Sequence, residues 1–377
     1  MDFTFTEEQQ AAAEAARGVF AGVAPDAVPS PALTPGAVAA DFDRPLWRRL
    51  ADADLLSLLL AEEHGGAGLD AVALCLVLRE SAKVLARVPL LESSAATAAV
   101  QAYGGADLKA ELLARAGRGE VVLTVAAHGR TGHDPAELAV TARQDGDHWV
   151  LDGVQTAVPW AYDADLVVVP ARTAADRTVL ALVPPGAQGV GLGEQFSTSG
   201  ERLGELRLES VRLSARDVIA AEGAWEWLRE LLATGTCALA LGLGERVLAM
   251  TSQYASKREQ FGHPIATFQA VAVQCADRYI DLRAMEATLW QAAWRITSGA
   301  AGALPAAGDV AVAKIWASEG VRRIVQSAQH LHGGFGADVD YPLHRYHAWA
   351  KHLELALGPA AAHEEALGEL LAAHPLG

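Results

Sequence analysis

The spacing of hydrophobic residues changes twice along this chain of 377 residues. Up to about residue 117, apolar residues recur every three or four positions, as they do on one face of a helix, which predicts several short helices. The first begins after Thr6, a residue suited to cap a helix N-terminus. Further helices are expected over residues 47–60, over residues 71–86 and in the segment that begins at Val88.

A strand pattern occupies the middle of the chain. Short β-branched runs such as VVLTVAA, HWVLDG and DLVVVPA are separated there by Asp-Gly, Pro and Gly. Longer, alanine-rich helical patterns follow over residues 238–258, 268–296 and 308–331 and again from Arg345. The order predicts three parts, namely a helical domain at 1–117, a β-domain at 118–222 and a helix bundle at 223–377.

Length and composition indicate a water-soluble protein. A chain of this size can form two or three packed units, because single hydrophobic cores stop growing at roughly 250 residues. Half of the residues are apolar, but no uninterrupted apolar run approaches the ~18 residues that span a bilayer. The first residues, MDFTFTEEQQ, are acidic and lack the basic and apolar segments of a secretion signal. We therefore expect a cytoplasmic protein without a membrane-spanning segment.

Neither nucleic acid nor a metal ion is an expected ligand. The net charge of −16 repels phosphate backbones, and no basic cluster offsets it. The cysteines lie far apart in apolar helical patterns, without zinc-site spacing, and are interpreted as small buried hydrophobes: Cys75, Cys237 and Cys275. Five histidines crowd the C-terminal region without a His-Glu-x-x-His pattern or paired cysteines, which favours packing or phosphate contact over metal binding: His330, His332, His344, His347 and His352.

Two polar segments near helix ends are candidates for binding a ligand. In KREQFGHPI, Arg258 carries a guanidinium suited to donate paired hydrogen bonds to a pyrophosphate, and Phe261 offers an aromatic face. The alternative is an arginine that caps a helix and a phenylalanine in the core. In HLHGGFG, Gly333 and Gly334 either let a ligand approach the backbone or simply terminate a helix. No Rossmann fingerprint is present, because the Gly-Leu-Gly at Gly242 lacks a third glycine.

Taken together, four segments resemble the acyl-CoA dehydrogenase family: LWRRLADADLLSLLLAEEHGGAGLD, VPLLES, KREQFGHPIATFQ and HLHGGFG, in that order. The resemblance covers nearly the whole chain. It implies an α+β fold with an N-terminal helical domain, a central antiparallel β-barrel or sandwich and a C-terminal four-helix bundle. It also implies FAD as cofactor and an acyl-CoA thioester as substrate. The family desaturates this thioester between the α and β carbons: a carboxylate takes the α-proton while the β-hydride passes to the flavin.

In this family the FAD lies across a subunit interface. One chain cradles the flavin ring, and a neighbouring chain grips the adenosine diphosphate end. The gripping residues match here, so the resemblance implies FAD binding through Arg258, Phe261, Gln269, His330, Leu331, His332, Gly333 and Gly334. His330 departs from the family's usual glutamine.

The cradling residues match poorly. Ala126-Ala127-His128-Gly129 stands where the family usually has Thr-Glu-Pro-Gly. Ala157 replaces a tryptophan that covers the flavin, and Pro159 replaces a threonine, which removes an aromatic contact and a hydrogen-bond donor. Trp160 is adjacent, but in a strand its side chain is expected on the opposite face.

Both positions at which family members carry the catalytic base hold leucine. One is Leu357, immediately before Gly358, and the other, by alignment, is Leu232 on the helix that precedes REQFG. Leucine cannot accept a proton. Glu230 lies two residues from Leu232, on a different face of the helix. No catalytic residue is therefore assigned to this chain.

The gripping residues are thus present, whereas the cradling residues and the base are not. In this combination, and in the segment ADVDYPLHRYHAWAK, the chain resembles the non-catalytic subunit of the heteromeric, α2β2 acyl-CoA dehydrogenases of bacterial steroid side-chain degradation. The resemblance implies a homologous catalytic subunit as partner and an electron-transfer flavoprotein as electron acceptor. A steroid, polyketide or branched acyl-CoA is compatible with the residues. Two alternatives stay open: a complete homomeric enzyme with an unconventional base such as Glu230, Glu354 or a histidine, and a flavin-free scaffold or acyl-binding protein.

Overall fold

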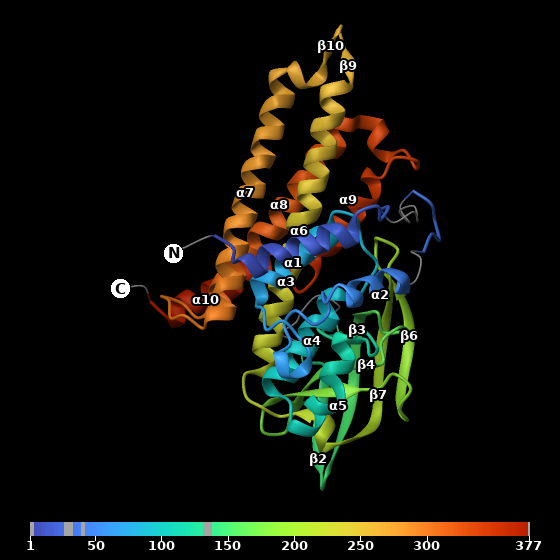
Figure 1. The fold of residues 1–377 in the computed structure, drawn as a ribbon, viewed down its shortest axis with the longest axis vertical. Coiled ribbons are helices and arrows are strands. Elements are labelled where there is room, and N and C mark those ends of the chain that lie inside the picture. The colour runs from blue at the N-terminus through green and yellow to red at the C-terminus, as the bar shows by residue number, and fades with distance from the viewer. Residues whose placement is uncertain (1–3, 26–32, 39–41, 131–137, 376–377) are drawn as a thin grey trace.

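The structure, a computed structural model, describes residues 4–25, 33–38, 42–130 and 138–375. Figure 1 shows a long helical bundle at one end of the molecule, a β-sheet at the other, and the N-terminal helices beside both. Helices, then strands, then helices follow one another along the chain in the predicted order.

The N-terminal part consists of short helices: α1 (Glu7–Phe20), α2 (Arg44–Asp52), the 3-10 helix η1 (Glu62–His64), α3 (Ala71–Ala82), α4 (Leu90–Tyr103) and α5 (Ala106–Gly117). Thr6 caps α1 as predicted, because its Oγ1 accepts a hydrogen bond from the Gln9 N–H at 3.2 Å. The Gln9 side chain in turn accepts one from the Thr6 N–H at 3.0 Å. α3 and α4 are buried on nearly all sides, so they form the centre of this part.

The helix expected over residues 47–60 is shorter than predicted and ends at Asp52. Asp54 takes the left-handed conformation, with φ 56°, and the N–H of Leu55 bonds back to the carbonyl of Leu50 at 2.9 Å. Most of the leucines that follow are buried, although the chain there passes through turns. A buried turn can thus reproduce the apolar spacing of a helix.

The middle of the chain forms one eight-stranded sheet: β1 (Leu123–Val125), β2 (Val140–Asp145), β3 (His148–Pro159), β4 (Leu166–Thr173), β5 (Thr178–Val183), β6 (Val190–Phe196), β7 (Arg202–Ser214) and β8 (Val218–Ile219). The strand order is β6-β7-β3-β2-β4-β5-β8, and β1 pairs with β4. A second hydrophobic core lies on this sheet and includes Leu151, Val167 and Leu206.

The expected antiparallel barrel or sandwich is instead an open, mixed sheet. β4 runs parallel to both β1 and β2, whereas the other pairs are antiparallel. β6 and β8 are the two ends of the strand order and do not pair with each other within the described residues. Parallel pairing needs a crossover between distant segments, which alternation of polar and apolar residues does not reveal.

The C-terminal part contains five α-helices within its described residues: α6 (Ala224–Lys257), α7 (Gln269–Ser298), α8 (Ala306–His332), α9 (Leu343–Leu355) and α10 (Ala360–Ala373). α6, α7 and α8 lie side by side, and α9 packs against α6 and α8 as the fourth helix of the expected bundle. α10, which the hydrophobic pattern did not predict, packs on α8. A small hairpin of β9 (Glu259–Gln260) and β10 (His263–Pro264) joins α6 to α7 at the far end of the bundle (Figure 1).

α6 is the central helix of the molecule. Within the described residues it alone is long and apolar enough to cross a membrane, but 78% of its apolar window is buried inside the protein. Gly242 lets α6 approach α3 closely, since a Cβ at this position would lie 2.0 Å from the carbonyl oxygen of Arg79. The Gly-Leu-Gly sequence on α6 therefore serves helix packing.

Candidate functional site

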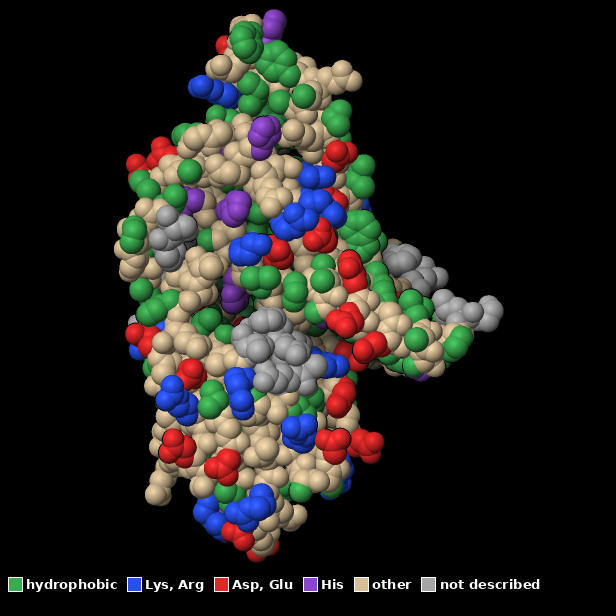
Figure 2. Space-filling view, turned by 180° about the vertical axis from the view of Figure 1, so that it is seen from behind, with side chains coloured by type: hydrophobic (Ala, Val, Ile, Leu, Met, Phe, Trp, Pro, Cys, Tyr) green, Lys and Arg blue, Asp and Glu red, His purple; other side chains and the backbone are tan. Residues whose placement is uncertain are grey.

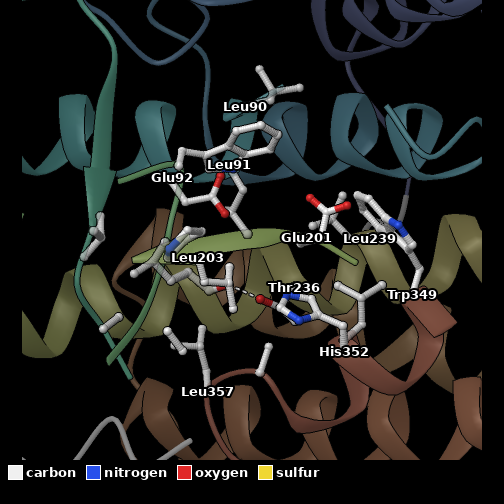
Figure 3. A pocket seen from close by; sticks show the side chains of 18 of the residues that line it. Leu90, Leu91, Glu92, Glu201, Leu203, Thr236, Leu239, Trp349, His352 and Leu357 are labelled. Atoms are coloured by element: carbon white, nitrogen blue, oxygen red, sulfur yellow. Dashed lines mark hydrogen bonds between the residues drawn. The ribbon is translucent and has the colours of Figure 1, made fainter. Parts of the chain in front are cut away.

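Both leucines at the expected base positions line one cavity. Leu232 comes from α6 and Leu357 from the turn after α9, and they share the cavity with His128, Ala157 and Pro159. Figure 3 shows Leu357 on the side of the cavity away from Leu91 and Glu92. The structure thus brings together residues from four segments that the alignment had placed in one site.

The turn that carries Leu357 is held in an uncommon conformation. Leu357 has φ 58°, in the left-handed region that disfavours a branched side chain, and its side chain is buried. The ammonium of Lys314 donates hydrogen bonds to the carbonyls of Gly358 at 3.0 Å, Glu354 at 3.2 Å and Leu353 at 3.3 Å. These bonds bind the end of α9 and the turn to α8.

Burial lowers the pKa of Lys314 to about 8, although a fourth acceptor, the Ser318 hydroxyl, lies 2.8 Å from its Nζ. Two histidines flank the same turn. His363 lies with Nε2 2.9 Å from the carbonyl oxygen of Leu357, and His352 lines the cavity. Burial and then the charge of Lys314 lower the pKa of each to about 4, so both imidazoles are neutral near pH 7.

Trp160 lies at the cavity, contrary to the expectation that it would face away from it. The pairing of β3 with β7 shifts register between Gln155 and Val158, and Ala157 and Trp160 have φ of 52° and 56°. These irregularities break the alternation of side chains along the strand. The indole also packs edge-on against Phe42, with ring centroids 6.0 Å apart.

Two carboxyl groups line the cavity, and sequence reasoning assigned a role to neither. Burial raises the pKa of Glu92, at the start of α4, to about 7, although hydrogen bonds from its backbone and from the Trp160 indole oppose the shift. Glu201 is buried in an ion pair with Arg87. The VPLLES segment, already recognised as part of the family pattern, is the only sequence signal that could have drawn attention to Glu92. Glu230 and Glu354, the bases considered for a complete enzyme, do not line the cavity.

The predicted cofactor-binding residues lie away from the cavity, at the end of the bundle where α6 and α8 end and α7 begins. Arg258 follows the last turn of α6, and its exposed guanidinium makes no ion pair or hydrogen bond with any residue that the structure describes. Phe261 lies in the β9–β10 turn with φ 53° and is 92% exposed. Gln269, also exposed, is the first residue of α7. Figure 2 shows hydrophobic side chains gathered at this end of the molecule.

The second group of predicted residues forms the C-terminus of α8. His330, Gly333 and Gly334 are exposed and Leu331 is half-buried. Gly333 has φ 59° and ψ −139°, a conformation available essentially only to glycine, and space is open where a Cβ would be. The His332 side chain is buried and bonded within the protein, so only its backbone can face a ligand.

The remaining candidate residues are the cysteines and the possible metal ligands. Cys75 and Cys237 are buried, as interpreted, and Cys275 is half-buried. Across the described part of the chain, no three His, Cys, Asp or Glu side chains are grouped so that they could hold a metal ion.

Comparisons with known proteins assign the family. The profile of the acyl-CoA dehydrogenase N-terminal domain matches residues 6–120, and that of the C-terminal domain matches residues 227–371. The chain is 38% identical over 339 residues to the acyl-CoA dehydrogenase FadE27 of Mycobacterium tuberculosis, an alignment that covers 89% of this chain and 90% of FadE27. It is 28% identical to FadE28 of the same organism, with 98% of each chain covered.

Two solved structures are similar over nearly their whole length. A chain of the ChsE4-ChsE5 complex from Mycobacterium tuberculosis superimposes with a TM-score of 0.90 at 36% identity and 100% coverage of both chains. A chain of the steroid ACAD Tcur3481-Tcur3483 gives a TM-score of 0.88 at 37% identity, covering 97% of this chain and 98% of that one. From these matches at both ends of the sequence and throughout the fold, this chain belongs to the acyl-CoA dehydrogenase family.

Proposed function

We propose that this chain is the non-catalytic subunit of a heteromeric, FAD-dependent acyl-CoA dehydrogenase. In this role it completes the FAD site of a homologous catalytic subunit in an α2β2 assembly that desaturates an acyl-CoA thioester. The observation that carries the proposal is an asymmetry. The cavity is lined by leucines at both base positions, whereas Arg258 and the Gly333–Gly334 turn at the end of the bundle are exposed and suited to a diphosphate.

The cavity lacks a base in the required place. A base must reach the α-proton of the substrate, and the side chains of Leu232 and Leu357 hold no proton acceptor. Glu92 comes from a different wall of the cavity and is bonded to the Trp160 indole, and Glu201 is paired with Arg87. Each carboxyl group therefore has a partner inside the protein.

The cavity also does not fit a flavin ring. Its volume is about 100 Å³. A cavity of about 150 Å³ holds one benzene ring, and ligand pockets usually measure about 300–1,000 Å³. Ala157 offers no aromatic cover, Pro159 offers no backbone N–H, and the Trp160 indole occupies the wall beside them. The cavity of this chain therefore does not accommodate the redox centre in this proposal.

The residues at the end of the bundle do fit the adenosine diphosphate part of FAD. We call Arg258, Phe261, Gln269, His330, Leu331, His332, Gly333 and Gly334 the clamp. Arg258 is exposed and has no partner among the described residues, so its guanidinium can donate paired hydrogen bonds to phosphate oxygens. The exposed backbone at Gly333 and Gly334 has no side chain to obstruct a ligand.

In such an assembly FAD, when bound, would supply the acceptor for the hydride from the substrate β-carbon. This chain would bind and orient the nucleotide end of the cofactor. Arg258 would neutralise the diphosphate charge, and Phe261, whose side chain is 92% exposed, would offer an aromatic face to the nucleotide. The strained φ of Phe261 fits this role, since strained, exposed positions are kept where they serve a function.

The similarity to a chain of the ChsE4-ChsE5 complex supports a heteromeric partner, and that to the Tcur3481-Tcur3483 steroid ACAD supports a steroid-CoA as substrate. An electron-transfer flavoprotein in the cytoplasm is the proposed electron acceptor.

The test is co-expression with a homologous chain that carries the catalytic glutamate. We expect the chain alone to be colourless or insoluble and the complex to be yellow and active. Arg258→Ala should raise the Kd of the complex for FAD by roughly 10- to 100-fold, because hydrogen bonds to charged groups contribute about 1.5–3 kcal/mol. Arg177→Ala, an exposed arginine in the turn between β4 and β5, is the matched control and should leave the Kd unchanged.

Other outcomes would support the alternatives. Steady turnover of an acyl-CoA with an artificial electron acceptor by this chain alone would establish a complete enzyme. If Arg258→Ala leaves the FAD content of the complex unchanged, the clamp is wrong and a flavin-free scaffold or acyl-binding protein is favoured.

A further inference from the structure

Four aromatic side chains stack between the ends of α6 and α8. Tyr254, on the last turn of α6, lies over His332 with ring centroids 4.3 Å apart and planes 23° from parallel. Tyr254 also stacks on Phe335 at 5.5 Å and 14°. Tyr341 contacts both His332, at 5.3 Å, and Phe335, at 4.4 Å. We call Tyr254, His332, Phe335 and Tyr341 the aromatic brace.

The brace has one defined hydrogen-bond arrangement. His332 Nδ1 lies 2.8 Å from the carbonyl oxygen of Ala328, which can only accept, so Nδ1 carries the proton. Nε2 is then an acceptor, and the Tyr341 hydroxyl donates to it at 3.1 Å. Burial lowers the pKa of His332, which agrees with a neutral ring. A buried imidazole with both nitrogens bonded fixes the orientation of its ring.

The brace connects the two halves of the clamp. The carbonyl of Tyr254 accepts the backbone N–H of Arg258 at 2.8 Å, so the tyrosine lies one helical turn before the arginine. On the other side, His332 directly precedes Gly333. The surrounding surface is open: Phe335 is 44% exposed, and Arg258, Gly333 and Gly334 are exposed as well. A glycine alone would end α8, so helix termination does not require a buried His–Tyr pair here.

We propose that the aromatic brace sets the spacing between Arg258 and the Gly333–Gly334 turn, and so the fit of the clamp to a diphosphate. Tyr254, His332 and Tyr341 are positioning residues in this inference, which rests on the proposed function. The brace acts on the adenosine diphosphate end of the cofactor alone, because its rings lie at the end of the bundle and none of them lines the cavity.

The probe is ADP, which carries the diphosphate and adenosine without the flavin ring. In the FAD-depleted complex with the catalytic partner, ADP competes with FAD during reloading, and its inhibition constant reports on the clamp. Tyr341→Phe removes one oxygen and leaves a buried acceptor unpaired, so we expect that constant to rise about fivefold. Tyr254→Leu removes the stacking and should raise it about tenfold, and Tyr254→Phe, which keeps the ring, should restore it to within about twofold of wild type.

Tyr103→Leu is the matched control. Tyr103 packs edge-on against Trp227, with centroids 5.9 Å apart. Trp227 lies near the start of α6, roughly 40 Å along the helix from Tyr254 at 1.5 Å per residue. This variant should lower the melting temperature without changing the ADP inhibition constant. If it weakens ADP as much as Tyr254→Leu does, the effect is general destabilisation and the brace is refuted.

Arg258→Ala separates the two ideas. If Arg258→Ala weakens ADP while Tyr341→Phe and Tyr254→Leu do not, the clamp stands and the brace is wrong. If Arg258→Ala has no effect on ADP, the proposed function fails and the brace fails with it. Should Tyr254→Leu not assemble, the single-atom change Tyr341→Phe decides by itself.

Discussion

Replacing Lys314 by methionine tests how the turn that carries Leu357 is held in place. The Lys314 ammonium is fully buried and has four acceptors, three of them backbone carbonyls of the α9 end and the following turn. Methionine has nearly the same length and shape but donates no hydrogen bond. The variant therefore leaves the carbonyls of Leu353, Glu354 and Gly358 with one donor fewer.

The magnitude depends on pH. The ammonium has three N–H groups, so at most three of the four acceptors are bonded at once, which contributes about 3 kcal/mol at about 1 kcal/mol each. Burial lowers the pKa of Lys314 from 10.5 to about 8, so the folded state binds fewer protons than the unfolded state between these values. The stability of the wild type therefore rises as pH increases through that window, by about 3 kcal/mol in total. We expect the loss of unfolding free energy caused by Lys314→Met to be about 3 kcal/mol larger near pH 10 than near pH 7.

The assay is urea unfolding of the wild-type and variant complexes, followed by circular dichroism at one protein concentration, because subunit association contributes to apparent stability. The difference in free energy of unfolding between the wild type and the variant isolates the effect of Lys314, because other groups that titrate above pH 8 contribute equally to both proteins. A difference that stays the same from about pH 7 to pH 10 would refute the lowered pKa. A variant as stable as the wild type at both values would refute the anchoring of the turn.

Three further changes test the cavity and the helix packing. Burial raises the pKa of Glu92 to about 7, so the stability of the wild type falls as pH rises from about 4.5 to 7. Near pH 8, Glu92→Gln should be more stable than the wild type by up to about 3 kcal/mol in urea unfolding. A difference in stability between the two proteins that is the same at about pH 4.5 and about pH 8 would contradict the raised pKa. Gly242→Ala places a methyl group 2.0 Å from a carbonyl oxygen of α3 and should lower the melting temperature by an amount equivalent to about 3 kcal/mol. The control is Gly18→Ala, whose methyl group would have no atom within 4 Å and should be neutral or slightly stabilising. Trp160→Ala should destabilise the complex by about 3 kcal/mol in the same assay, and a loss below about 1 kcal/mol would show that the indole does not fill the cavity wall.

The order of helices and strands could be predicted from hydrophobic spacing because each part repeats one period over many residues. The positions of Leu232 and Leu357 in one cavity could also be anticipated, since the motifs near them fix the alignment. The hydrophobic spacing predicted too long a helix over residues 47–60, because the buried leucines after the left-handed Asp54 lie outside the helix. Local patterns do not distinguish these two arrangements.

The place of Trp160 could not be predicted for a related reason. Its side chain reaches the cavity because the β3–β7 register shifts and two residues take positive φ, and neither irregularity has a signature in the sequence of β3. Similarly, Glu92 becomes a buried carboxyl group only through elements far away in the chain. Contacts between distant segments decide burial and pKa, whereas a single sequence reports only on neighbours along the chain.

The β9–β10 turn has a consequence for how the protein is made. In the proposed assembly, the Phe261 ring, which is 92% exposed in the turn between β9 and β10, would be covered only once this chain binds its partner subunit. A surplus of this polypeptide over its counterpart would accumulate with that ring uncovered and attract chaperones, proteases or other copies. For the proposed assembly, balanced synthesis of the two chains would therefore raise the yield, in the cell and in the laboratory alike.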